Sequence, residues 1–543
     1  MKKAKLWYGA CLTAIISLCS LASCNGGYSP EDKFDKDGRL ILNLKNVYFD
    51  TWQGEDRYTE VINDMFGVKV KASNYDYNSW DTMVSTAING NNITDSIHFN
   101  LKAYNFGSTY EKWVSSYKML KPLPDDMSKW PELKKAIDKV SNVDKLKIDG
   151  KLYGIPILND IVATEKDFSN FTYVYRRDWA KQIDEANKDK AGYIPVYKEG
   201  DVYTWDEFDR LIKALHTNIK TITGFDSACV FVDEAWGFPS ITNFYKDAPH
   251  CYTKDSSGKA INAFTSEKYL QGLEKAKEFV DNQYYSKDQF TFKDGKANEL
   301  YLGGQAAILY DNFSFSNYLK LRKGFKKNQK YADLDDGTAF LKIKGEDDNF
   351  ALEGTENWFS MTMFNAKISD NKLNKILDVL NYLLSDEGTK LAIYGIEGYD
   401  YNIVDGEVVL SEMGWEKGSD GAYGPKTNGA KYLRYMATLG NDTKSFDPYT
   451  EQDAYKILND WYVEMKAAKD ANQLRVVQEP ADVSWMSTPT KNNKTQSLLN
   501  NANVSVKKYC FNKFDSVEGY KSDITKYTDW EKVLSEINEK LGK

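Results

Sequence analysis

The stretch Arg39 to Asp50, RLILNLKNVYFD, predicts a buried β-strand, because Leu40, Leu42 and Leu44 alternate with other residues and no helical spacing is present. Helices are predicted next over 56–65 and 79–89, and strands over 68–73 and 95–99. Alternation of strands and helices predicts parallel strands joined by crossover helices, an α/β fold. Ligands of such sheets bind beyond the carboxyl ends of the strands, so loops 48–53 and 100–106 are the first expected binding loops.

Later segments extend the same pattern. Residues 151–158, 171–175 and 305–310 predict short buried strands. Thr204 and Glu207 form a capping box that opens a helix through His216. Further helices are predicted over 268–282, 373–385 and 530–541, and no internal repeat is found.

The N-terminal segment predicts export and a lipid anchor. Lysines 2, 3 and 5 precede an apolar run over 6–21 that is too short to remain a spanning helix. The tetrapeptide Leu21-Ala22-Ser23-Cys24 resembles the lipobox of bacterial lipoproteins, which implies cleavage after residue 23 and lipidation of Cys24. The alternative is an ordinary signal peptide with an incidental cysteine. Residues 25–38 are charged and rich in glycine, and we expect residues 24–38 to form a flexible tether.

Composition narrows the classes of partner. Loss of residues 1–23 would leave 520 residues and, with three lysines removed, shift the net charge from −8 to −11. An acidic chain is not expected to bind nucleic acid or an anionic membrane surface. The length predicts two lobes or one large α/β body, and we expect a monomer.

Cysteine and histidine usage predicts neither a disulfide scaffold nor a metal centre. Cys229, Cys251 and Cys510 remain in the folded body, and the sequence leaves open a bridge between Cys229 and Cys251 or isolated thiols. The three histidines lack the spacing of a zinc site, and the Asp-rich turns before Gly38 and Gly337 lack a calcium loop. We therefore expect no metal and no cofactor.

Aromatic residues make up 14% of the chain, including 37 tyrosines and 13 tryptophans. Such side chains combine an apolar face with a polar tip, which suits sugars, although a compositional habit of the source genome would give the same count. Signatures of a phosphate-binding loop, a nucleophile elbow and a dinucleotide-binding loop are missing. A glycosidase carboxylate pair needs no local motif, so the sequence leaves it open.

Several motifs, in this order, resemble the family 1 extracellular solute-binding proteins of bacterial ABC importers, in particular their lipoprotein-type carbohydrate-binding members. The motifs are Gly150-Lys151-Leu152-Tyr153-Gly154-Ile155-Pro156, Tyr175-Arg176-Arg177-Asp178-Trp179, Thr204-Trp205-Asp206-Glu207-Phe208, Gly304-Gln305-Ala306-Ala307 and Tyr394-Gly395-Ile396-Glu397-Gly398-Tyr399-Asp400-Tyr401. Gln305 departs from the lysine that is common in the family.

The resemblance implies a two-lobed periplasmic-binding-protein-like fold (type II), with a hinge between the lobes and a ligand enclosed by closure. The expected boundaries are 39–165 plus 304–360 for the N-terminal lobe and 166–303 plus 361–543 for the C-terminal lobe. Chain crossings are expected near 160–172, 303–311 and 358–363. The expected function is a non-enzymatic receptor, anchored to the cell membrane through Cys24 on its extracytoplasmic face, that delivers a carbohydrate to ABC permease subunits.

The expected ligand is an oligosaccharide, because sugars stack on aromatic rings and pair with planar polar groups. Expected stacking residues are Trp52, Trp236, Trp358 and Tyr399. Expected hydrogen-bonding residues are Asn105, Asp311 and Glu397. Each tryptophan could instead belong to the core, and Glu397 could cap backbone amides. The alternative functions are a membrane-tethered glycan-degrading enzyme that uses a carboxylate pair, and a structural or adhesive lipoprotein.

Overall fold

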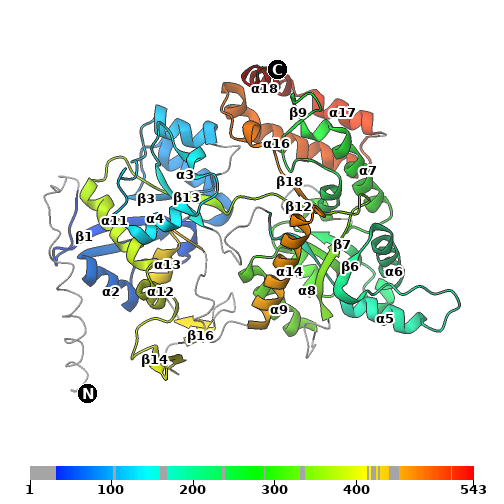
Figure 1. Cartoon of the computed structure of the whole chain (residues 1–543), viewed down its shortest axis with the longest axis horizontal. Coiled ribbons are helices and arrows are strands. Elements are labelled where there is room, and N and C mark those ends of the chain that lie inside the picture. Colours follow the sequence, from blue (N-terminus) through cyan, green and yellow to red (C-terminus); the bar gives the residue numbers. More distant parts are fainter. Residues whose placement is uncertain are drawn as a thin grey trace.

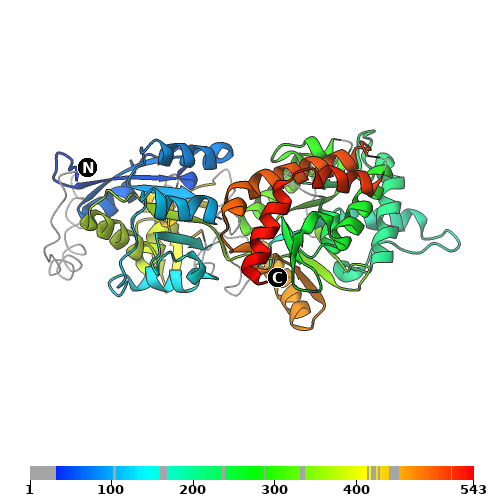
Figure 2. The same ribbon diagram turned by 90° about the horizontal axis from the view of Figure 1, so that it is seen from above.

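The chain forms two lobes that lie side by side along its longest axis (Figures 1 and 2). The computed structural model describes residues 32–101, 106–158, 168–234, 239–286, 288–329, 337–411, 415–417, 423–425, 428–439, 452–514 and 516–543. Cys24 and the predicted tether up to residue 31 lie outside the described residues.

The first lobe is built on two small sheets that lie beside each other. Its strands are β1 (Leu40–Asn46), β2 (Val68–Asn74), β3 (Ser96–Phe99), β4 (Gly154–Leu158) and β13 (Trp358–Phe364). The pair β1 and β2 is parallel, as the sequence predicted, whereas β13 is antiparallel to both β3 and β4. The backbone amide of Asn43 donates to the Asp95 carboxylate at 2.7 Å, which joins the two sheets.

Helices cover both faces of these sheets. They are α2 (Arg57–Phe66), α3 (Trp80–Asn89), α4 (Pro131–Asp138), α11 (Asp370–Leu383), α12 (Asp386–Ile393) and α13 (Gly429–Arg434). Leu40, Leu42 and Leu44 are buried against α2 and α11, so the alternating leucines form the lobe's core. Two hairpins extend this lobe, β14 (Tyr401–Val404) with β15 (Glu407–Leu410) and β16 (Trp415–Lys417) with β17 (Tyr423–Pro425).

The second lobe contains a five-stranded mixed sheet in the order β6-β11-β5-β10-β7. These strands are β5 (Phe171–Tyr175), β6 (Val202–Tyr203), β7 (Cys229–Asp233), β10 (Ala306–Asn312) and β11 (Ala339–Ile343). Two pairs accompany it, β8 (Tyr252–Lys254) with β9 (Ala260–Asn262) and β12 (Phe350–Glu353) with β18 (Leu474–Val477). Cys229, Cys251 and Cys510 are free buried thiols, so no bridge joins Cys229 to Cys251.

Helices surround the second sheet, and the last ones form a cap beside β8 and β9 (Figure 1). The helices are α5 (Arg177–Asn187), α6 (Trp205–Thr223), α7 (Glu267–Asp281), α8 (Lys296–Leu302), α9 (Phe315–Gln329), α14 (Gln452–Asp470), α15 (Ala481–Ser484), α16 (Pro489–Cys510), α17 (Val517–Thr525) and α18 (Asp529–Leu541). The predicted capping box of Thr204 and Glu207 is present at the start of α6. Among the described residues, no helix is both long and apolar enough to cross a bilayer.

Strand pairing corrects two of the expected lobe boundaries. Residues 304–360 were assigned to the first lobe, yet β10 and β11 pair with β5 in the second lobe's sheet. Residues 361–543 were assigned to the second lobe, yet β13 pairs with β3 and β4, and α11 to α13 pack on the first lobe's core. The expected crossing at 303–311 is therefore wrong, because those residues are an inner part of the second sheet.

A second contact between the lobes lies outside the connecting segments. The Trp485 ring of the second lobe lies 5.7 Å from the Phe106 ring and 6.2 Å from the Trp358 ring of the first lobe. Ser487 Oγ donates to Glu111 Oε2 at 2.8 Å. A side chain on Gly107 would collide with the Asn492 amide at the start of α16. This contact, which we call the lobe bridge (485–492 against 106–111), restricts how the lobes move.

Gly107→Val is expected to push the two sides of the lobe bridge apart, because the new side chain would occupy the space of the Asn492 side-chain amide. Small-angle scattering should then show a larger radius of gyration for the ligand-free protein. Adding Asn492→Ala to the same chain removes the collision and should restore the original radius. An unchanged radius in Gly107→Val would show that the lobe bridge does not hold the lobes together.

Candidate functional site

The two sheets direct their strand ends toward one junction. The carbonyl of Leu158, the last residue of β4, accepts a hydrogen bond from the Leu439 amide at 2.8 Å. On the other side, Phe168 bridges to Gly354, and the amide of Ser169 donates to the Glu353 carbonyl at 2.7 Å. The chain passes between the lobes after Leu158, around Gly354 and after Leu439, and the described residues at these points are held together in two pairs. This is the hinge arrangement that lets two lobes rotate about one region.

The first lobe presents tyrosines at this junction. Tyr48 follows β1, Tyr77 follows β2, and Tyr435 follows α13. The rings of Tyr48 and Tyr435 lie 6.0 Å apart in an edge-to-face arrangement. Burial raises the pKa of the Tyr48 hydroxyl, and the nearby Tyr77 and Tyr435 hydroxyls raise it further. The three phenols, which we call the tyrosine ledge, therefore share one small region.

Two buried polar groups lie beside the tyrosine ledge. His98 Nδ1 accepts from the Val47 amide at 3.4 Å, so the Nε2 atom carries the proton of the neutral ring. Burial holds the pKa of His98 well below its ordinary value. Among the described residues, neither His98 Nε2 nor Asn46 Nδ2 has a hydrogen-bond partner. Both are donors, and the His98 ring lies 5.4 Å from that of Tyr48.

The second lobe presents carboxylates at the ends of two neighbouring parallel strands. Asp233 ends β7 and pairs in register with Tyr310 of β10, which places Glu234 and Asp311 side by side. Asn298 Nδ2 donates to Asp311 Oδ2 at 2.6 Å and to Glu234 Oε2 at 3.2 Å. We call Asp233, Glu234, Asp294 and Asp311 the carboxylate wall.

The carboxylate wall lies on the junction side of the second lobe, because Asn312 pairs with Phe171 of β5, and Phe168, just before that strand, bridges to Gly354. Tyr77 exposes half of its surface, yet desolvation raises the pKa of its hydroxyl, because protein atoms surround the region into which it points. The Asp294 carboxylate of the second lobe raises the same pKa further.

Within the wall, burial changes the protonation of two carboxyl groups. It raises the pKa of Asp233 to about 6, although Ser240 and Tyr285 donate hydrogen bonds to that carboxylate. Burial likewise raises the pKa of Asp311 to about 6, and the charges of Glu234 and Asp294 act in the same direction. Both groups are mainly ionised at pH 7 and lose their charge in mildly acidic solution.

The carboxylate oxygens of the wall are already engaged. Asp233 accepts from Ser240 and Tyr285, Glu234 accepts from the Gly295 amide at 2.5 Å, and Asp311 accepts from Asn298 and from the Asn312 amide. A carboxylate oxygen has a second lone pair that can accept a hydroxyl proton. Asp233, Glu234 and Asp311 are 4%, 5% and 6% exposed, so these bonds fix their carboxylates in place, and Asp294 is the exposed member of the wall.

The structure gives two of the expected stacking residues a place in the core. Trp52 is 5% exposed, stacks on Tyr432 at 5.4 Å and donates from Nε1 to Asp56 Oδ2 at 2.6 Å. Trp358 is 3% exposed and donates from Nε1 to the Ser141 carbonyl at 3.1 Å. Burial on both faces leaves these rings without a surface for a sugar. This corrects their predicted stacking role.

The other expected residues fall into three places. Asp311 lies in the carboxylate wall, and its role stays a prediction. Glu397 and Tyr399 are exposed on a turn of the first lobe, where the Arg57 guanidinium lies 4.0 Å from the Tyr399 ring. No contact joins these two residues to the tyrosine ledge in the described structure. Asn105 and Trp236 lie outside the described residues.

Sequence reasoning identified one of the relevant loops but not the relevant side chain. Loop 48–53 was selected because it follows the first strand, and Tyr48 begins it. Tyr77 could have been found by the same rule, since it follows the second strand by three residues. Tyr435 and Asp294 had no signal in the sequence, because only the folded chain brings them to the strand ends.

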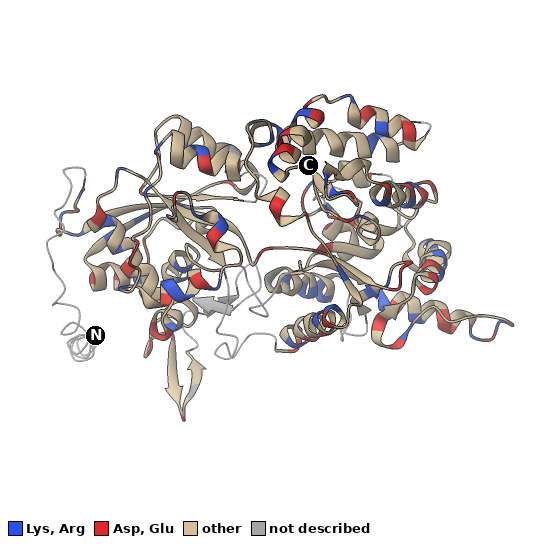
Figure 3. Cartoon of the chain, turned by 45° about the horizontal axis from the view of Figure 1, so that its top comes forward, with Lys and Arg blue, Asp and Glu red and all other residues tan. Residues whose placement is uncertain are grey.

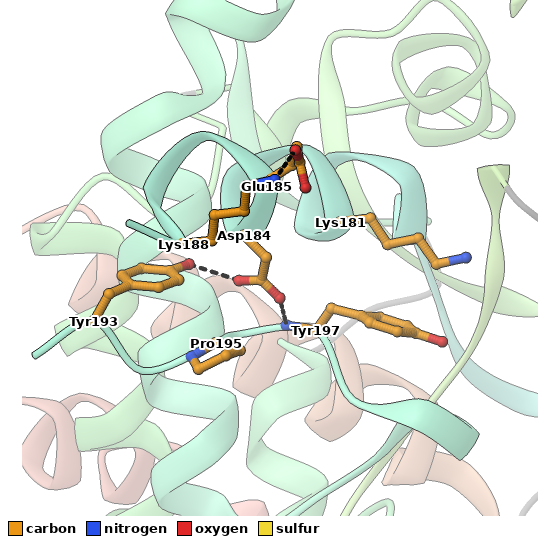
Figure 4. A pocket seen from close by; sticks show the side chains of 7 residues that line it. All are labelled: Lys181, Asp184, Glu185, Lys188, Tyr193, Pro195 and Tyr197. Carbon is orange, nitrogen blue, oxygen red and sulfur yellow. Dashed lines mark hydrogen bonds and ion pairs between the residues drawn. The ribbon is translucent and has the colours of Figure 1, made fainter. Parts of the chain in front are cut away.

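A separate shallow pocket of about 340 Å³ lies on the outer side of the second lobe, between α5 and the segment that follows it (Figure 4). Asp184 at its centre accepts hydrogen bonds from the Tyr193 hydroxyl and from the amides of Val196 and Tyr197. These bonds hold the segment to its helix.

In the part of the chain that the structure describes, no group of three or more His, Cys, Asp or Glu side chains is arranged so that it could hold a metal ion.

Comparison with known proteins supports the fold. No family model matches the chain. It is 23% identical over 391 residues to the polygalacturonan/rhamnogalacturonan-binding protein YtcQ of Bacillus subtilis strain 168, covering 70% of this chain and 71% of that protein. It is 22% identical over 265 residues to the lipoprotein LipO of the same strain, covering 48% of each. The chain thus spans about half of LipO.

Solved structures resemble the whole described body. An extracellular solute-binding protein from Bifidobacterium longum subsp. infantis has a TM-score of 0.62 at 13% identity, covering 93% of this chain and 100% of that one. The Streptococcus pneumoniae ABC-transporter substrate-binding protein FusA, in complex with kestose, has a TM-score of 0.60 at 13% identity, covering 92% and 99%. The predicted two-lobed α/β fold and the resemblance to solute-binding proteins are confirmed.

Trp52→Ala is expected to lower the free energy of unfolding by about 3–5 kcal/mol, because a buried ring and its packing are lost. Tyr77→Ala serves as the matched control and should change that energy by about 1 kcal/mol or less, since Tyr77 is half exposed. Urea unfolding measures both. Equal stability of Trp52→Ala and the parent protein would contradict the core role of Trp52.

Asp311 is expected to make stability fall as pH rises from about 4 to about 6. Its folded-state pKa exceeds the ordinary value, so the folded protein binds the proton more tightly than the unfolded chain in this range. Asp311→Asn should therefore reduce the loss of unfolding free energy between pH 4 and pH 7 by on the order of 2 kcal/mol. Asp226→Asn, at an exposed loop, is the control. Identical pH slopes for Asp311→Asn and the parent would refute this assignment.

Proposed function

We propose that this protein is a lipid-anchored extracytoplasmic receptor that captures a carbohydrate between its lobes and delivers it to the permease of an ABC importer. The observation that carries the proposal is the position of the tyrosine ledge and the carboxylate wall beside the hinge residues: Tyr435 lies just before Thr438, which bridges to Leu158, and Asn312 pairs with Phe171, just after Phe168, which bridges to Gly354. Phenol rings cover the apolar faces of a sugar, while carboxylates accept protons from its hydroxyls.

The hinge gives this arrangement its mechanism. A ligand that contacts both faces binds the closed form better than the open form, so binding shifts the population toward closure. The permease subunits could then distinguish loaded from empty receptor by shape. The lobe bridge would stay near the axis of this rotation, since Trp485 packs against Trp358 at the start of β13.

Relatives support the carbohydrate and the location. YtcQ is named for binding polygalacturonan and rhamnogalacturonan, FusA was solved with kestose, and LipO is named a lipoprotein. We propose that Cys24 carries the lipid of the anchor and that residues 25–31 link it to the receptor. The expected tether ends there and not at residue 38, because the Ile41 amide donates to the Lys33 carbonyl at 2.9 Å and Ser369 Oγ donates to Asp32 at 2.8 Å, which hold this segment on the first lobe. Stable anchoring requires more than one acyl chain, as a single chain holds a protein only marginally.

A non-enzymatic role is proposed over the glycan-degrading alternative. A glycosidase needs one carboxyl group free to protonate the leaving oxygen and a second free to act on the sugar ring or on water. The Asp233, Glu234 and Asp311 carboxylates instead accept bonds from neighbouring backbone and side-chain groups. Their fixed position favours binding.

Calorimetry of the mature chain against a panel of oligosaccharides tests the function. At least one sugar is expected to bind without appearance of cleavage products. Tyr77→Ala should weaken that binding by about tenfold, because ring contacts contribute about 0.5–1.5 kcal/mol beyond area burial. Tyr117→Ala, on an exposed surface of the same lobe, is the matched control. Turnover of the sugar at enzymatic rates, or full affinity in Tyr77→Ala, would contradict the proposal.

A further inference from the structure

The carboxylate wall gathers several acidic side chains in one place without a counterion. Some other buried or partly buried acids of this lobe are paired with cations, as are Glu353 with Lys246 at 2.9 Å and Asp201 with Arg177, whereas Asp184 accepts only from neutral donors. On the outer helices of both lobes, acidic and basic residues are interspersed (Figure 3). Among the described residues, by contrast, no lysine or arginine forms an ion pair with Asp233, Glu234, Asp294 or Asp311.

Neutral groups take the place of counterions at the wall. The Asn298 amide lies between Glu234 and Asp311 and donates to both. Ser240 and Tyr285 hydroxyls donate to Asp233. Such partners satisfy the carboxylate oxygens as hydrogen-bond acceptors and leave the negative charges uncompensated. The raised pKa of Asp311 is a consequence of burial and of these neighbouring charges.

The tyrosine ledge adds no positive charge. Its three phenols are neutral, and burial keeps the neighbouring His98 ring neutral as well. A cation lies on the same strand as the start of this region: Lys45 belongs to β1, and its ammonium lies 4.4 Å from the centre of the Tyr75 ring. Desolvation lowers the pKa of Lys45, and no carboxylate pairs with it in the described structure.

We infer that the site between the lobes takes uncharged oligosaccharides and discriminates against those that carry uronate carboxylates, with Glu234, Asp294 and Asp311 as the selecting residues. This inference rests on the proposed function and names the class of substrate. A sugar hydroxyl donates a hydrogen bond to a carboxylate oxygen. The ionised carboxylate of a uronate has no proton to donate, and it adds a negative charge beside several others in a partly desolvated space. The charge of the ligand would thus differ from that of polygalacturonan, for which YtcQ is named.

The test compares ligands that differ mainly in charge. The mature chain is titrated with a panel of neutral oligosaccharides (gluco-, manno-, galacto- and fructo-oligosaccharides) and of uronate oligosaccharides (oligogalacturonides and oligoalginates). The tightest neutral ligand is then oxidised at its primary hydroxyls to carboxylates and titrated again. We expect a neutral ligand to bind and its oxidised form to bind at least about 100-fold more weakly, with a smaller ratio at high salt.

Charge reversal at an exposed position identifies the source of the discrimination. Asp294→Lys should narrow the ratio of neutral to oxidised affinity at least about tenfold, because it replaces repulsion by attraction at the rim of the wall. Asp294 is exposed, so this substitution is expected to leave the fold intact. Glu299→Lys, exposed on α8, makes the same change in net charge and should leave the ratio within about twofold.

Several results would overturn the inference. Uronate ligands that bind as tightly as neutral ones, or an oxidised ligand that keeps its affinity, would contradict the discrimination while leaving the receptor function in place. Loss of uronate binding in Lys45→Met would then show that the first lobe supplies the cation. An equal narrowing in Glu299→Lys would assign the effect to net charge and not to the wall. Absence of binding across the whole panel would overturn the receptor function itself.

Discussion

The structure depends on one constraint, the meeting of the two lobes where strands of both sheets begin or end. The Leu158 carbonyl accepts a hydrogen bond from the Leu439 amide, and Phe168 bridges to Gly354, so the described residues beside the connections between the lobes are held in two pairs. β4, β7 and β10 end on this side of their sheets, whereas β5 and β13, which run antiparallel to their neighbours, begin there. A ligand held there contacts both lobes at once, and the same connections allow the lobes to rotate.

Local elements could be predicted because their signals are local. The alternating leucines of β1, the capping box of α6 and the apolar stripe of α18 each appear within a few residues of sequence. Each element begins close to its expected start, although α6 continues to Thr223, beyond the expected end at His216. The assignment of strands to lobes failed for a physical reason. Residues 306–312 form a buried strand in any α/β lobe, and only pairing with Phe171–Tyr175, more than a hundred residues away, decides which sheet they join.

The binding residues show the same division. A loop after a strand could be located, but the choice between its side chains depends on burial that forms with the tertiary structure. Trp52 lies against Tyr432, nearly four hundred residues later in the chain, and so becomes a core residue. Tyr48 in the same loop turns toward the junction, where Tyr435 joins it. The carboxylate wall arises similarly, from the parallel register of β7 with β10.

The central claim is that a sugar closes the two lobes on each other. It is tested most directly by the distance between spin labels at Tyr117→Cys in the first lobe and Phe225→Cys in the second, both exposed positions. The three cysteines of the folded body are buried, and Cys24→Ser removes the remaining thiol of the mature chain. Saturation with the neutral oligosaccharide that binds tightest should shift and narrow the distance distribution. An unchanged distribution at a concentration where calorimetry shows full occupancy would contradict the account.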